Sequence, residues 1–329
     1  MRCAAGCVLA GVVAGGCVAV RYVPQAVRGQ AQLLLTGREV AAVVADPQTD
    51  PNTRALLSHV GAVKRFARAQ GLTPTSSYER FVDVGRTAVV WVVSAAPPLS
   101  LEPVRWDVPV LGPFPYLGWF SQEDAAWHAR RLRAQGLDVD VRPASAYSTL
   151  GWTRDPVLST MLGRGPDAAG QLADVLLHES VHATLHVPGD TAFNEGLASF
   201  LAEQLTPRFL AEQFGAESAE ARAWADTVSS SERRAARMHQ AARALQALYA
   251  SPLPVHDKLA RKWRAIALLR EELGTARWLN NASLAQFLVY ESASGAFAAL
   301  LARCDGDTRR FLAWMAAERT LAVRRSACP

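Results

Sequence analysis

Residues 176–200 read LLHESVHATLHVPGDTAFNEGLASF, and this stretch predicts two helices joined by a tight bend. Pro188 and Gly189 favour the end of the first helix, and Asp190 is a suitable N-cap for the second. Apolar residues recur at helical spacing along the first helix: Leu172, Val175, Leu176 and Ala183. A helical hairpin is therefore expected near the middle of the chain.

The first helix of this hairpin carries His178 and His182 four residues apart. Residues at this spacing share one face of a helix and lie about 6 Å apart along its axis, so the two imidazoles can converge on one zinc ion. Glu179 stands beside the first histidine, where it can reach a zinc-activated water as a general base. The alternative is an amphipathic helix with histidines on its polar edge.

A catalytic zinc site needs a third protein ligand and one open position. His186 is too far along a straight helix, about 12 Å from His178, and is expected at the helix end or behind the ligands. Glu195 is better placed, because His182 and Glu195 each lie about 9 Å from the bend. Antiparallel packing would set them level. The alternative for Glu195 is an exposed charge in the first turn of its helix.

The composition is ordinary for a globular protein, and the charge pattern argues against a nucleic-acid partner. The 329 residues are 50% hydrophobic and 20% charged, which suits one large domain or two smaller ones. The formal net charge of +5 is spread along the chain without a Lys/Arg block. We therefore expect no nucleic-acid partner.

The amino terminus, MRCAAGCVLAGVVAGGCVAV, has a basic start, a modest apolar run and small residues before Cys17. This order resembles the signal peptide of a bacterial lipoprotein, and it predicts lipidation at Cys17. The expected location is the cell envelope, with a lipid anchor in the outer membrane on its periplasmic face. An uncleaved membrane anchor is the alternative. Cys304 and Cys328 could pair in an oxidising compartment.

The remaining pattern predicts an α+β protein that is predominantly helical. A small mixed β-sheet region is expected to pack on a helical, zincin-like region that carries HESVH and the following glutamate helix. The expected segments are a lipoprotein signal peptide over 1–16, a helical segment over 17–75, a sheet-containing region over 76–152 and a helical metallopeptidase region over 153–329. The last two are expected to form one catalytic unit.

The motif His178-Glu-Ser-Val-His182 followed by Asn194-Glu195 resembles the gluzincin metallopeptidases, in which a glutamate on the next helix is the third zinc ligand. The chain is still more similar to a bacterial family of predicted aminopeptidases. The tracts that carry this likeness are QAVRGQ at 25–30, AYSTLGW at 146–152, Asp155-Pro156 with Leu158-Ser-Thr160, DTAFNE at 190–195 and LNNA at 279–282.

The resemblance implies a zinc metallopeptidase, an aminopeptidase that holds one Zn²⁺ through His178, His182 and Glu195 and acts on peptides. Thermolysin-like enzymes place an Asp four residues after the glutamate ligand, whereas this chain has Ser199 there; Glu203 is the candidate substitute. Tyr290 and Tyr147 are candidates for the oxyanion donor, and for either of them a packed tyrosine with a satisfied hydroxyl is the favoured alternative. A metal-dependent amidase on cell-wall peptides and a non-catalytic envelope lipoprotein remain alternatives, and the oligomeric state stays open.

Overall fold

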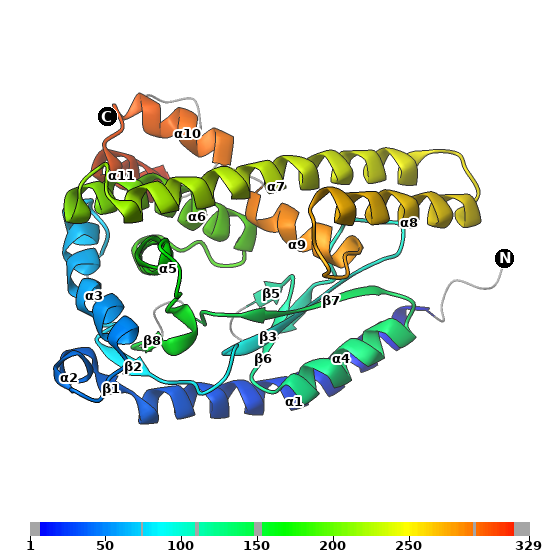
Figure 1. Ribbon diagram of the computed structural model, residues 1–329. Helices are drawn as coiled ribbons and strands as arrows, with labels where there is room; N and C mark the ends of the chain where they lie inside the picture. Colours follow the sequence, from blue (N-terminus) through cyan, green and yellow to red (C-terminus); the bar gives the residue numbers. More distant parts are fainter. Residues whose placement is uncertain (1–6, 74, 109–111, 148–152, 292–293, 319–329) are drawn as a thin grey trace. The chain divides into compact units, whose positions relative to one another are not determined.

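The computed structural model describes residues 7–73, 75–108, 112–147, 153–291 and 294–318 (Figure 1). Helices make up 62% of the chain and the sheets are small and mixed, which confirms the predicted α+β, mostly helical class. The chain divides into two compact units. Unit 1 contains Met1–Leu35, Ala88–Ala144 and Arg233–Leu288, and unit 2 contains Thr36–Thr87, Ser145–Glu232 and Val289–Pro329. The domain boundaries expected from the sequence stay predictions.

Unit 1 is built around a three-stranded antiparallel sheet. Strand β3 (Val90–Ala96) is central and pairs with β6 (Leu117–Trp119) and β7 (Asp138–Ala144). Strands β4 (Trp106–Val108) and β5 (Gly112–Phe114) form a separate hairpin. The helices of this unit are α1 (Cys7–Thr36), α4 (Gln122–Ala134), α8 (Val255–Glu272) and most of α7 (Ala219–Ala250) and α9 (Asn281–Glu291).

Helix α4 packs against β3 and β7, and its small residues allow the close approach (Figure 1). Ala125 and Ala129 are fully buried beside Trp119 in one apolar cluster. The helix begins as its sequence predicts, because the side chain of Ser121 accepts a hydrogen bond from the Asp124 N–H. Apolar burial and a capped start therefore fix this helix on the sheet.

Two tracts that carry the family likeness have structural roles in unit 1. The side-chain amide of Asn281 donates to the carbonyl oxygens of Pro97, Pro98 and Ser100 at 2.9–3.1 Å. The Gln25 side chain accepts from the Phe120 N–H at 2.9 Å. These buried or half-buried amides satisfy loop backbone groups that no strand or helix reaches.

Unit 2 contains the other sheet, with strand order β1-β2-β8. β1 (Arg38–Glu39) runs antiparallel to β2 (Arg80–Val82), and β2 runs parallel to β8 (Val157–Leu158). The helices are α2 (Val40–Ala45), α3 (Pro51–Ala69), α5 (Ala168–Thr184), α6 (Thr191–Phe214), α10 (Ser294–Arg303) and α11 (Thr308–Glu318), with the start of α7 and the 3-10 turn η1 (Ser159–Met161).

Helices α5 and α6 form the centre of unit 2. Their facing apolar residues are almost completely buried: Leu172, Leu176, Leu177 and Val181 on α5, and Leu197, Leu201 and Leu205 on α6. Helix α3 packs on α5 and also contacts α6, with Phe66 edge-on to Phe209 at 5.6 Å between ring centres. The hairpin predicted from residues 176–200 is therefore present and lies in the core of its unit.

Short strands were the elements that the sequence analysis missed. The expected helical segment over 17–75 is interrupted by Gly37 and β1, and β8 lies in the region over 153–329 that was expected to be helical. Both strands have two residues, too few for an alternating pattern. None of the helices in the described part of the chain combines the length and the apolar composition that a membrane span requires. Cys304 is disulfide-bonded, and Cys328 lies outside the described residues.

Candidate metal centre

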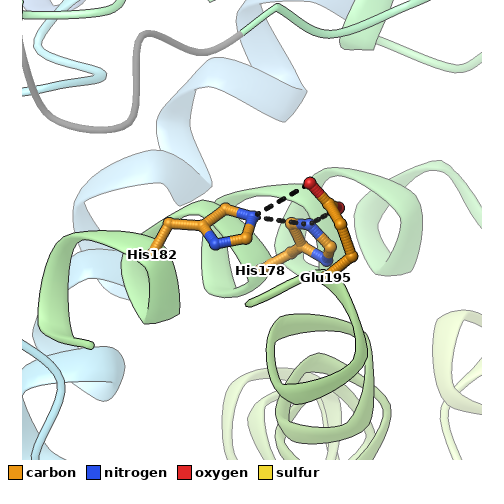
Figure 2. A group of neighbouring side chains, drawn as sticks. All are labelled: His178, His182 and Glu195. Carbon is orange, nitrogen blue, oxygen red and sulfur yellow. Dashed lines mark hydrogen bonds and ion pairs between the residues drawn. The ribbon is translucent and has the colours of Figure 1, made fainter. Parts of the chain in front are cut away.

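His178 and His182 lie on the same face of α5, as their spacing predicts. Their Nε2 atoms approach to 3.2 Å, and their rings are nearly perpendicular with centres 4.8 Å apart. The His182 side chain is 3% exposed and that of His178 is 20% exposed. Both imidazoles thus present the same nitrogen to one point at the edge of the core (Figure 2).

The bend after α5 aims the next helix back at the histidines. α5 ends at Thr184, three residues before the expected end near Val187, and Gly189 takes a positive φ of 81°. The Asp190 side chain caps α6 by accepting from the Phe193 N–H at 3.0 Å. The buried Asn194 side chain both accepts from the Val187 N–H and donates to the Val187 carbonyl, each at 2.8 Å. Two hydrogen bonds therefore connect the two sides of the bend at the residue before Glu195.

Glu195 reaches the two histidines from α6 (Figure 2). Its carboxylate oxygens lie 3.4 Å from the His178 Nε2 and 3.9 Å from the His182 Nε2. One ligand atom from each of the three residues falls within 4.8 Å of the others. The structure thus brings together the three residues that the sequence analysis selected, and the alternative of Glu195 as an exposed first-turn charge is wrong because its side chain is only 13% exposed.

The arrangement fits a divalent metal ion. Two imidazole nitrogens and one carboxylate form a donor set typical of catalytic zinc, with bonds of about 2.0–2.2 Å. Tetrahedral bonds of that length place ligand atoms roughly 3.3 Å apart. Two of the observed separations, 3.2 and 3.4 Å, are close to this value, and the third, between His182 and Glu195, is longer at 3.9 Å. Within the described part of the chain, this is the group of His, Cys, Asp and Glu side chains with such spacing.

The protonation states of the histidines differ in the metal-free protein. Burial, and then the charge of His178, lower the pKa of His182 to about 4. Burial also acts to lower the pKa of His178, but the carboxylates of Glu195, Glu179 and Asp174 outweigh it and raise that pKa. His182 is therefore neutral at pH 7, as a metal ligand must be, whereas the neighbouring carboxylates favour the protonated form of His178.

Glu179 stands beside the metal-binding group without belonging to it. It follows His178 on α5, is only partly exposed, and its Oε2 atom is buried. Its negative charge acts on His178 and also on the phenol of Tyr78. The role of Glu179 as a general base stays a prediction.

The carboxyl group whose charge acts on His178 from within α5 is that of Asp174; for Glu203, an orienting role and an ordinary exposed glutamate were the two alternatives. Glu203 is exposed on α6, which argues against an orienting role. Asp174 lies one turn before His178 on α5 and accepts a weak hydrogen bond from Thr206 on α6 at 3.4 Å. Burial raises the pKa of Asp174 to about 6, and the charge of His178 opposes that rise. The four-residue spacing of Asp174 and His178 places both side chains on one helical face, and the sequence analysis could have predicted their interaction from it.

The other predicted residues have mixed outcomes. His186 lies beyond the end of α5, is exposed, and is not part of the three-residue group, as expected. Tyr147 is half-buried, and burial with the charge of Asp155 raises its pKa. The Tyr290 side chain and residues 148–152 of the AYSTLGW tract lie outside the described residues. Cys17 is within α1, and its side chain is not described.

The charge of Glu179 also acts on Tyr78, a residue that the sequence analysis did not select. It is buried, and after burial itself the largest contribution to its raised pKa is the charge of Glu179. Tyr78 is one hundred positions before the zinc-type motif, and no motif marks it. Its φ is positive at 66°, a backbone conformation that the sequence does not reveal at a tyrosine.

The centre consists of two imidazoles and a carboxylate on a helical hairpin, with a glutamate next to the first imidazole in the sequence. It is therefore a candidate site for a metal ion that catalyses hydrolysis. The match to known families agrees with that class. The family model described as "Putative aminopeptidase" matches residues 21–327, and the chain belongs to this family. No curated protein and no solved structure matches the chain.

Proposed function

We propose that this chain is a zinc-dependent metallopeptidase of the gluzincin type that removes residues from the amino terminus of peptides. The observation that carries the proposal is the convergence of His178, His182 and Glu195 on one point, with Glu179 beside it. Membership of an aminopeptidase family supports a peptide substrate. A purely structural metal site would need no neighbouring base.

Zinc, when held by the two histidines and Glu195, would supply a Lewis acid that activates water and polarises a peptide carbonyl. Glu179 accepts the proton from the attacking water as the water oxygen bonds to the carbonyl carbon. It then delivers that proton to the amide nitrogen as the C–N bond breaks. The carbonyl electrons move to the oxygen during attack and return when the amine leaves.

Metal analysis of the purified chain tests the ligand assignment. Wild-type protein should hold about one equivalent of zinc, since three protein ligands define one catalytic site. The His178→Ala variant should lose it, because two remaining ligands cannot complete the site. Equal zinc content in the two proteins would overturn the assignment.

The Glu179→Gln variant tests the role of the base separately. It should keep its zinc, because Glu179 is outside the three-residue group, while kcat on peptides falls about 10²–10⁴-fold. Peptides with a free amino terminus, the same peptides after N-acetylation, and cell-wall peptides should be compared as substrates. Hydrolysis of N-acetylated or cell-wall substrates alone would replace the aminopeptidase assignment with an endopeptidase or amidase.

We also propose that the chain is lipid-anchored at Cys17 in the bacterial cell envelope. The support is the order of a basic start, an apolar run and Ala14-Gly15-Gly16 before the cysteine.

A further inference from the structure

Helix α1 packs on unit 1 through a face that repeats every three or four residues. Val18 is buried in the apolar cluster around Trp119, and the Tyr22 ring lies edge-on to that indole with ring centres 5.4 Å apart. A Cβ atom at Gly29 would collide with the Phe120 ring, so glycine allows the close approach there. The residues of this packed face are all buried or half-buried: Val18, Tyr22, Gln25, Gly29 and Leu33.

The opposite face of α1 is apolar and exposed to solvent. The exposed fraction is 77% at Val20, 64% at Val27 and 82% at Leu35. At a helical rotation of about 100° per residue, the residues of this face fall within an arc of about 120° centred opposite the packed face. They form an apolar stripe about 22 Å long, which consists of Val20, Val23, Pro24, Val27, Ala31 and Leu35.

The charge beside the apolar stripe is positive. The sequence has no Asp or Glu before Glu39, so α1 carries no acidic residue. Arg21 and Arg28 each follow a residue of the stripe directly and therefore border it. Arg28 is exposed, and Arg21 is ion-paired with Asp124 of α4. An exposed apolar stripe with a basic edge is complementary to the headgroups of anionic phospholipids.

The apolar stripe is small for a contact between two protein chains. Six side chains of this kind expose on the order of 500 Å² together, so a two-fold contact through the stripe would bury about 1,000 Å². Stable and specific interfaces bury about 1,200–2,000 Å². A bilayer surface needs no matching shape, and its attraction for a helix grows with the apolar area buried. The stripe therefore fits a lipid surface better than a second copy of the chain.

The apolar stripe also continues from the proposed site of acylation. Cys17 precedes Val20 by three residues, and both positions belong to α1. Positions three residues apart share a helical face, so an acyl group on Cys17 would start from the face that carries the stripe. The acyl group and the stripe would then reach the same membrane surface.

We propose that the apolar stripe of α1 binds the surface of a phospholipid bilayer, with the helix lying along that surface. The inference rests on the proposed anchor at Cys17 and adds a second contact to it. The valine and leucine side chains of the stripe enter the boundary between headgroups and acyl chains, and the Arg28 guanidinium contacts lipid phosphates at the edge. A single acyl chain gives weak and reversible binding, whereas an acyl chain with a second contact holds a protein stably.

Photo-crosslinking locates this contact in the acylated wild-type protein. The protein is incorporated into vesicles of phosphatidylethanolamine and phosphatidylglycerol that contain a phospholipid with a photoreactive acyl chain. After illumination, mass spectrometry identifies the peptides that carry lipid. We expect the crosslinks within residues 20–35 rather than within residues 233–250 of α7, which belong to the same unit.

The Val27→Asp variant tests the apolar stripe without the acyl group. It is made in the Cys17→Ser chain and compared with Ala244→Asp, at an exposed position of α7, in the same background. Sedimentation with the same vesicles measures the partitioning of each chain. Val27→Asp should bind at least about 10-fold more weakly, because it puts a charge into the stripe and repels anionic lipid. Ala244→Asp should bind as the Cys17→Ser chain does, and all three chains should have the same melting temperature.

Three results would overturn the assignment. The first is a set of crosslinks that lies wholly outside residues 20–35, and the second is equal partitioning of the Val27→Asp and Ala244→Asp chains. The third is dimer formation that Val27→Asp abolishes, without vesicle binding, which would assign the stripe to a second copy of the chain. Wild-type protein without an acyl group would contradict the anchor at Cys17 alone, since the Cys17→Ser chains still test the stripe. Neither readout depends on peptidase activity, so the peptidase function succeeds or fails separately.

Discussion

Asp174 is a buried carboxyl group one helical turn before His178. Burial raises its pKa to about 6 from the ordinary aspartate value of 3.8. The carboxyl group of Asp174 therefore binds its proton more tightly in the folded state than in the unfolded state. Its contribution to stability is greatest below pH 4 and is lost as the pH rises to about 6. Above that pH the ionised, desolvated carboxylate costs up to about 3 kcal/mol.

Asp174→Asn should therefore stabilise the metal-free protein at pH 7.5 by up to about 3 kcal/mol, because asparagine cannot ionise. At pH 4 the gain should vanish, since Asp174 is then protonated. Urea unfolding with a chelator present, at both pH values, measures the difference. Asp226→Asn, at an exposed position of α7, is the control and should change little. An equal gain from Asp174→Asn at both pH values would mean that ionisation is not its cause.

At the residue scale, the sequence predicted those site residues whose relation is local. His178, Glu179 and His182 share one helical face, so the helix period alone places them. Tyr78 and Asp155 are different, because the hydrogen bond from the Tyr78 N–H to the Asp155 carbonyl depends on the parallel pairing of β2 with β8 across more than seventy residues. A tertiary contact of this kind has no periodic signature in a single sequence.

At the scale of elements, the bend between α5 and α6 decides where Glu195 points. The prediction placed Glu195 correctly although α5 ends earlier than expected, because the Asp190 cap fixes the start of α6 independently. The double hydrogen bond from Asn194 to Val187 was not predicted. It depends on a side chain folding back across the bend, which spacing does not reveal.

Asn194→Ala should loosen that bend and weaken metal binding. It removes two hydrogen bonds from a buried side chain, so we expect about 1–3 kcal/mol of lost stability. Zinc affinity should fall at least about 10-fold, since Glu195 is the next residue and such supporting contacts typically contribute 10–100-fold. Chelator competition measures the affinity, with Asp190→Ala, a cap loss of about 1 kcal/mol, for comparison. Unchanged affinity in Asn194→Ala would show that the cap alone holds Glu195 in place.

At the scale of the whole molecule, the family likeness extends beyond the site. The tracts around Gln25 and Asn281 belong to unit 1, where their amides satisfy loop and strand-end backbone groups. Their role could not be predicted from one sequence, because the partners at Phe120 and Pro97 lie far away along the chain. The α+β class could be predicted, since it needs only the count and type of long elements.

The start of unit 1 bears on the proposed lipid anchor. Val18 is buried with Trp119 in the core of unit 1, Tyr22 stacks edge-on against Trp119, and Arg21 is hydrogen-bonded to Asp124. Among the described side chains, packing against the core of unit 1 is therefore present one residue after Cys17. An acyl chain on Cys17 would be joined to unit 1 without a flexible linker, so unit 1 would be held directly at the membrane surface.

Replacement of Cys17 tests this arrangement. Wild-type protein grown with a labelled fatty acid should incorporate the label and lose residues 1–16, which mass spectrometry of the mature chain detects. Cys17→Ser should lose both the label and the cleavage, because the acceptor thiol is gone. Cys7→Ser is the matched control and should keep both, since Cys7 is in the segment that cleavage removes. Label retained in Cys17→Ser, or lost in Cys7→Ser instead, would move the anchor away from Cys17 and with it the direct attachment of unit 1 to the membrane.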